Sequence, residues 1–134
     1  MLEIEFRGRS THNGEWHYGW LTYSKFHDAY EITDGNGVYN FVDPKTVGPY
    51  TGLKDKNGKK IFKSDIVKQT MKVNGEIIKR LAKIIFEDGS YWLSYSNSQI
   101  FKLSQNTIDI YELEIIGNIS DNPELMNNKR GENG

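Results

Sequence analysis

A chain of 134 residues is long enough for one domain with its own hydrophobic core, or for two small β units in one chain. Its 17 Lys and Arg nearly balance its 18 Asp and Glu, so the overall charge does not favour nucleic acid or a membrane, and electrostatic binding would need a local patch. The chain has no cysteine, which excludes a disulfide framework, thiol catalysis and cysteine-ligated zinc, and no apolar run approaches the ~20 residues that cross a bilayer.

The first part of the chain predicts strands joined by turns that contain glycine. Apolar residues alternate at its start, which places Leu2, Ile4 and Phe6 on one face of a strand. The pair Asn13-Gly14 accepts positive φ angles and predicts a tight turn into the second strand. The predicted strands of this part cover residues 2–7, 15–24, 30–32 and 38–42.

The second part begins with the stretch YTGLKDKNGKKIFKSDIVK, residues 50–68. Residues 55–58 have the chemistry of a tight turn, in which Gly58 can adopt the left-handed conformation. Further turns are expected at Asn74-Gly75 and Asp88-Gly89. The predicted strands of this part cover residues 61–62, 66–73, 76–86, 90–96, 99–104 and 111–119.

Residues 76–86 fit two structures. Five apolar residues in this segment have the spacing of a helical stripe, whereas the turn pairs on both sides favour a strand. As a strand, the segment places Ile78, Ala82 and Ile84 on one face, which Arg80 interrupts. We expect a strand, with the helix as the alternative.

The C-terminal region predicts a short helical turn and a tail. Asp121 or Asn122 can cap a helix that begins at Pro123. Residues 127–134 are polar and contain glycine, which predicts a flexible tail. We therefore expect one mainly β domain over residues 1–126, a compact barrel or sandwich, with two β units meeting near residue 49 as the alternative.

Three segments resemble, in order and spacing, the YopX family of phage and prophage proteins. They are the stretch of residues 50–68, AKIIFEDGSYWL at 82–93 and LEIIGNISDNPELM at 113–126; the opening LEIEFRGRS is also similar. The sequence departs from the usual family pattern at Phe62, where a tyrosine is common, and at Ser64, where a glycine is common. The resemblance implies a second half like an SH3-type barrel and an origin in a mobile element, hence a bacterial-host cytoplasm. It implies no activity and no catalytic residue.

The aromatic residues Trp16, Tyr18 and Trp20 alternate along the second predicted strand. Flat rings on one strand face can stack the bases of a single-stranded nucleic acid when a positive groove lies beside them. A small domain must also bury most of its large rings, so we expect these side chains mainly in the core.

The lysines of the 50–68 stretch are the second candidate surface. Lys54, Lys56, Lys59 and Lys60 could contact phosphates together. Lysines also keep a hairpin edge from pairing with other chains, and the near-zero overall charge favours that structural role.

Catalytic and metal-binding motifs are weak in this sequence. His12, His17 and His27 lack helical metal-ligand spacing, and the segments DGNG and DKNG do not continue as calcium loops. No nucleophile elbow or phosphate-binding loop is present. We therefore expect no catalytic residue, no metal and no cofactor.

The sequence predicts a non-enzymatic accessory protein that binds a macromolecule or another copy of itself, and no membrane. The first alternative is a nucleic-acid-binding module that uses the aromatic row together with the lysine loop. The second alternative is a small metal-dependent enzyme, in which scattered histidines and carboxylates assemble only in three dimensions.

Overall fold

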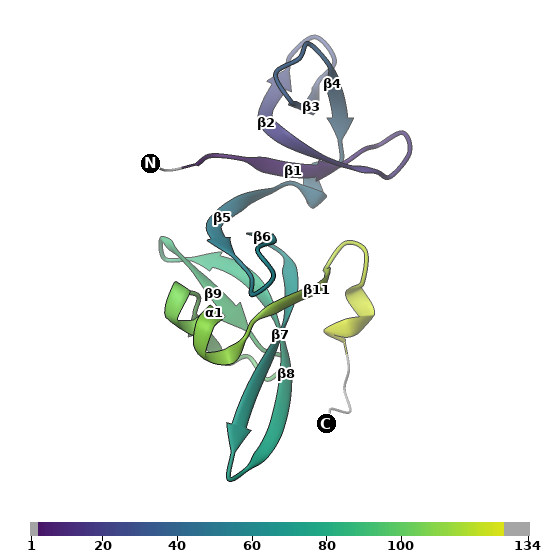
Figure 1. Cartoon of the computed structure of the whole chain (residues 1–134). Coiled ribbons are helices and arrows are strands. Elements are labelled where there is room, and N and C mark those ends of the chain that lie inside the picture. The colour runs from purple at the N-terminus through teal and green to yellow at the C-terminus, as the bar shows by residue number, and fades with distance from the viewer. Residues whose placement is uncertain (1–2, 128–134) are drawn as a thin grey trace. The chain divides into compact units, whose positions relative to one another are not determined.

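A computed structural model describes residues 3–127; residues 1–2 and most of the predicted tail, 128–134, lie outside the described residues. The described chain is mainly β and falls into two compact units on either side of the Gly52–Leu53 peptide (Figure 1). Its helices are short, and within residues 3–127 none is long and apolar enough to cross a membrane.

The strands of the first unit lie in the order β4-β3-β2-β1-β5, within a six-stranded sheet that β6 (Lys60–Phe62) completes next to β5. A bridge between Ser10 and Val42 joins the end of β1 to the end of β4, and Asp43 N donates to Arg9 O at 2.9 Å. The elements are β1 Phe6–Arg9, β2 Trp16–Ser24, β3 Ala29–Thr33, β4 Tyr39–Val42, the 3-10 helix η1 Pro44–Thr46 and β5 Gly48–Lys54, which runs into the second unit.

Two glycines let the strands of this unit approach closely. A Cβ on Gly8 would lie 2.9 Å from Val42 Cβ, so only glycine fits beside that buried valine. Gly19 has a φ of 153° and lies against the carbonyl of Thr33, at the point where β2 stops pairing with β1 and begins to pair with β3. Both sites therefore depend on the absence of a side chain.

The predicted start of the first strand is wrong. The strand begins at Phe6 rather than at residue 2, Ile4 is exposed, and Leu2 lies outside the described residues. The pairing of β1 with β2 starts at Phe6 and Gly19, because β2 changes partner there. The apolar alternation of the sequence therefore extends beyond the hydrogen-bonded strand.

The second unit contains a five-stranded antiparallel sheet with the order β10-β9-β8-β7-β11. Within the described residues β10 and β11 are its two edges, so the sheet is open rather than a closed barrel. Its likeness to an SH3-type barrel stays a prediction. The elements are β6 Lys60–Phe62, β7 Asp65–Val73, β8 Glu76–Glu87, β9 Ser90–Ser94, β10 Ile100–Lys102, α1 Gln105–Tyr111, β11 Glu114–Asn118 and the 3-10 helix η2 Pro123–Leu125.

Residues 76–86 form a strand, as expected from the turn pairs around them. Residues 76–83 pair with β7, and residues 83–87 pair with β9. Ala82 and Ile84 are buried on one face, whereas Ile77 and Ile78 remain exposed near the Asn74-Gly75 turn. The helical spacing of the isoleucines did not determine the structure, because two partner strands satisfy the backbone hydrogen bonds of this segment.

The helix α1 was not predicted. The Oγ of Ser104 accepts a hydrogen bond from Thr107 N and caps the helix, which ends at Glu112 in the left-handed conformation. Predicted strand 99–104 is shortened to β10, and predicted strand 111–119 is shortened to β11. The short helical turn predicted at Pro123 is confirmed as η2.

The core of the second unit lies between the inner face of the sheet, the β6 segment and α1. Its fully buried aliphatic side chains come from segments far apart in the sequence, so the core requires most of the unit to be folded. The buried cluster comprises Ile61, Val67, Ala82, Ile84, Leu93, Tyr95, Leu103, Ile108 and Leu113.

Candidate functional site

The aromatic row of β2 is on the surface of the first unit. Tyr18 is 46% exposed and Trp20 is 56% exposed, whereas Trp16 is half-buried with the guanidinium of Arg7 4.7 Å from its ring centroid. The expectation that this row fills the core is therefore wrong for Tyr18 and Trp20. On the opposite face of the sheet, Gly8 lies so close to Val42 that no Cβ fits between them.

The exposed rings of β2 are continued on β4. The register aligns Trp20 with Thr33 on β3 and Thr33 with Tyr39 on β4, so the three side chains share one face of the sheet. Tyr39 is 57% exposed and Thr33 is buried between its neighbours. Phe41 lies on the same face, two residues further along β4. We call Tyr18, Trp20, Tyr39 and Phe41 the aromatic face.

Histidines contact this face. The ring of His27 lies 5.1 Å from that of Phe41, and the ring of His12 lies 6.2 Å from it. His17 directly precedes Tyr18 in β2, so its side chain lies on the opposite face of the sheet from the aromatic face. Within residues 3–127 no three His, Asp or Glu side chains are grouped closely enough to hold a metal ion.

The lysine loop belongs to the second unit, so the structure does not bring it together with the aromatic row in one unit. The side chains of Lys54, Lys56 and Lys59 are exposed, and Lys60 is half-buried in β6. Lys56 Nζ lies 3.9 Å from Glu114 Oε1. The first unit itself carries four Lys and Arg against seven Asp and Glu, which does not favour a phosphate ligand at the aromatic face.

A buried aspartate organises the lysine loop. Asp55 Oδ1 accepts hydrogen bonds from Asn57 N and Lys59 N, both at 2.9 Å, and its Oδ2 accepts one from Ile115 N at 2.9 Å. The carboxylate therefore closes the turn and ties it to β11. This arrangement gives the 55–59 turn a structural role, whatever its lysines contact.

The turn between β6 and β7 depends on Ser64 and Asp65. Ser64 has a φ of 77°, in the left-handed region that favours glycine. Its N donates to Ile84 O at 2.8 Å, and its carbonyl accepts from Ile119 N at 2.9 Å. Asp65 Oδ2 accepts from Phe62 N at 2.7 Å. The positive φ is thus retained although serine replaces the glycine that is usual in the resembled pattern.

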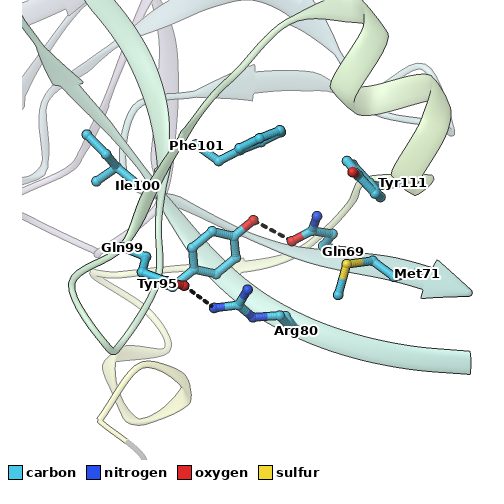
Figure 2. Close-up of a pocket in the computed structure, with 8 residues that line it drawn as sticks. All are labelled: Gln69, Met71, Arg80, Tyr95, Gln99, Ile100, Phe101 and Tyr111. Carbon is cyan, nitrogen blue, oxygen red and sulfur yellow. Dashed lines mark hydrogen bonds between the residues drawn. The ribbon is translucent and has the colours of Figure 1, made fainter. Parts of the chain in front are cut away.

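A groove of about 390 Å³ lies in the second unit and was not predicted (Figure 2). The Tyr95 ring lies between Gln69 and Arg80, with the Arg80 guanidinium 3.9 Å from the ring centroid. The Tyr95 hydroxyl donates to Gln69 Oε1, and Arg80 Nη2 donates to Gln99 Oε1 at 3.4 Å. Met71, Ile100, Phe101 and Tyr111 complete the lining.

The groove has few groups for acid–base chemistry. Burial raises the pKa of Tyr95, against smaller opposing effects of Arg80 and the Gln69 hydrogen bond, so the phenol stays neutral at physiological pH. None of the eight lining side chains is a carboxylate, histidine, serine or cysteine. The arrangement suits binding of an apolar group with an amide or acidic substituent. In the sequence, this groove was indicated by Arg80, which interrupts the apolar face of β8.

These features define a mainly β protein of two compact units with an exposed aromatic sheet face in the first and an amphipathic groove in the second. The family model described as YopX protein matches residues 5–127, and the chain belongs to this family, as its motifs predicted.

Among solved structures, a similar one covers nearly the whole chain. It is the crystal structure of protein EF1440 from Enterococcus faecalis, with 22% sequence identity and a TM-score of 0.57. The match covers 94% of this chain and 99% of that chain, and at this identity it shows the fold alone. Comparison with curated proteins gives no match.

Proposed function

We propose that this protein is a non-enzymatic binding module that self-associates through the aromatic face. The observation that carries this proposal is the exposure of Trp20 on β2 and Tyr39 on β4, with the buried Thr33 of β3 between them. Large exposed rings beside one another cost free energy in water, and aromatic side chains are enriched at the centres of protein interfaces. The resemblance to phage and prophage proteins suggests an accessory role in a bacterial cytoplasm.

A second copy of the chain fits this face better than a nucleic acid. Its unit is acidic, and Glu31 lies on the same face between Thr22 and Phe41. A phosphate backbone would be repelled there, whereas two copies related by a two-fold axis can cover each other's rings. The metal-dependent enzyme has less support, since His12 and His27 contact the Phe41 ring and, within residues 3–127, no group of His, Asp and Glu side chains could hold a metal ion.

Light scattering on the full chain tests this proposal. The wild type is expected to show a multiple of the mass of one chain, and Trp20→Thr with Tyr39→Thr is expected to shift it to one chain at the same concentration. Threonine keeps the strand preference of both positions, so the sheet should persist. Phe86→Thr is the control, since Phe86 is also an exposed ring, at 47%, but lies in the second unit.

Two results would overturn the proposal. One is a wild type that has the mass of a single chain at all concentrations. The other is an oligomer that survives the paired substitution but dissociates in Ile77→Thr with Ile78→Thr, which would move the interface to β8.

A further inference from the structure

The strands β7 and β8 extend beyond their neighbours as a two-stranded ribbon. On β7, pairing with β11 reaches no further than Lys68, and on β8, pairing with β9 starts at Lys83. Between these points the two strands pair only with each other, up to the turn at Asn74-Gly75. Figure 1 shows this ribbon projecting from the rest of the second unit.

Lysines gather on one face of this ribbon and of the sheet that it leaves. The register places Lys72 diagonally from Lys79, and Lys68 diagonally from Lys83. The backbones of two residues in such a diagonal pair are about 7–8 Å apart, which is within reach of long side chains. Lys102 on β10 lies on the same face, opposite Trp92. We call Lys68, Lys72, Lys79, Lys83 and Lys102 the lysine face; it is the face opposite to the core.

Carboxylates do not balance these charges. Glu114 accepts ion pairs from Lys68 at 3.3 Å and from Lys56 at 3.9 Å, so one carboxylate serves two lysines. Glu87 is the other acid that the register places on this face, at the far end of β8. Within the described residues, Lys72 and Lys79 have no acidic partner.

A polar cleft of about 350 Å³ lies at one end of the lysine face. Lys83 lines it with the hydroxyl-bearing Ser94, Ser96 and Ser98 and the amide of Asn127. The remaining lining residues are Tyr95, Ile119, Pro123 and Met126. An ammonium group with several hydroxyl and amide donors matches the chemistry of a phosphate group. The cleft therefore continues the positive row with donors that lysines alone do not provide.

We propose that the lysine face binds the phosphate backbone of duplex DNA, with the β7–β8 ribbon lying along a groove. A two-stranded ribbon fits the major groove, and this one carries lysines on both strands. A single strand is less suited, because base stacking needs free flat rings. Trp92 is the one ring that the register of the described strands places on this face, and it already contacts Glu87 O and Lys102.

DNA binding by the lysine face and self-association through the aromatic face use different units, so each can fail without the other. The lysine face shares no residue with the lysine loop that the sequence suggested as a phosphate site. About four backbone contacts would give a slope of log K against log salt of about −3 to −4.

Fluorescence anisotropy with labelled duplex and single-stranded DNA, at several salt concentrations, tests the assignment. The wild type is expected to bind duplex with that slope. Lys72→Gln with Lys79→Gln is expected to weaken binding at least about tenfold and to reduce the slope by about 2. Lys25→Gln with Lys45→Gln is the matched control, since it removes two exposed lysines from the first unit and should leave the slope unchanged.

Three results would overturn the inference. They are the absence of duplex binding at low salt, tighter binding of the single strand than of the duplex, and a loss that appears in Lys54→Gln with Lys59→Gln instead of in the ribbon pair. Circular dichroism melting of each variant shows that a loss of binding does not come from unfolding.

Discussion

Ser64 adopts a backbone conformation that a side chain disfavours. Its φ of 77° lies in the left-handed region, and its N and carbonyl both form backbone hydrogen bonds, so the turn cannot relax without losing them. Glycine adopts this conformation without the strain of a Cβ, which costs about 1–2 kcal/mol in L-residues. A family that usually carries glycine at this position is consistent with that requirement.

We therefore expect Ser64→Gly to raise the free energy of unfolding by about 0.5–1 kcal/mol, after the greater chain entropy of glycine in the unfolded state is subtracted. Urea denaturation of both proteins measures the difference. Ser96→Gly, at an exposed position without a positive φ, should lower the free energy slightly. A destabilised Ser64→Gly protein would contradict this account of the turn.

Asp55 holds the lysine loop through three backbone donors. Replacing it by asparagine leaves one acceptor oxygen in place of two, so at least one of Asn57 N, Lys59 N and Ile115 N loses its partner. We expect Asp55→Asn to lower the free energy of unfolding by about 2 kcal/mol. Asp88→Asn, in an exposed turn with a φ of 51°, should have little effect. Equal losses in the two variants would refute the role of Asp55.

Tyr95 predicts a loss of stability at alkaline pH. Because burial raises its pKa in the folded state above the usual 10.0, the unfolded chain loses this proton first as pH rises. The stabilising contribution of Tyr95 is therefore complete below pH 10 and falls as pH increases through the folded pKa. In Tyr95→Phe the urea midpoint should fall less steeply above pH 10, although the variant is less stable at neutral pH because Gln69 loses its donor. An unchanged slope would show that Tyr95 does not titrate on unfolding.

Among the elements, α1 depends most visibly on a single residue outside it. Ser104 Oγ accepts from Thr107 N, and the helix has only seven residues, so little else stabilises its first turn. We expect Ser104→Ala to lower the free energy of unfolding by about 1 kcal/mol. Ser98→Ala is not a suitable control because of its positive φ, whereas Ser96→Ala is exposed and should be neutral. A neutral Ser104→Ala would mean that packing of Ile108 alone maintains the helix.

The strands that the sequence predicted well are those with turn pairs at both ends. Residues 76–86 illustrate this, because Asn74-Gly75 and Asp88-Gly89 determined the outcome against a helical spacing of isoleucines. The helix α1 was missed because its signal is one capping serine and two buried residues. The start of β1 was misplaced because pairing depends on where β2 changes partner, and a sequence does not reveal that change except through Gly19.

The candidate surfaces were only partly predictable. The sequence indicated Tyr18 and Trp20 as residues of interest but placed them in the core, since the face of β2 that is covered depends on its pairing with β1 and β3. The groove around Tyr95 and the lysine face both need the register of four strands, which joins residues such as Lys72 and Lys102 across long sequence separations. The alternation along β7 and β8 could have indicated the lysines, had the strand assignment been certain.

At the scale of the whole molecule, the two units differ in net charge. The first unit has seven acidic and four basic residues, whereas the second has thirteen basic and eleven acidic residues. The net charge of −1 for the chain conceals this difference. We therefore propose self-association for the acidic unit, through its exposed rings, and phosphate binding for the basic unit, through the ribbon.

The measurement that tests this division most directly is sedimentation velocity of the full chain with a labelled DNA duplex at low salt. In the wild type we expect an oligomer that carries the duplex. In Trp20→Thr with Tyr39→Thr we expect a single chain that still carries the duplex, because the lysine face is intact. A variant that keeps the wild-type mass, or that loses the duplex together with the oligomer, would contradict the account.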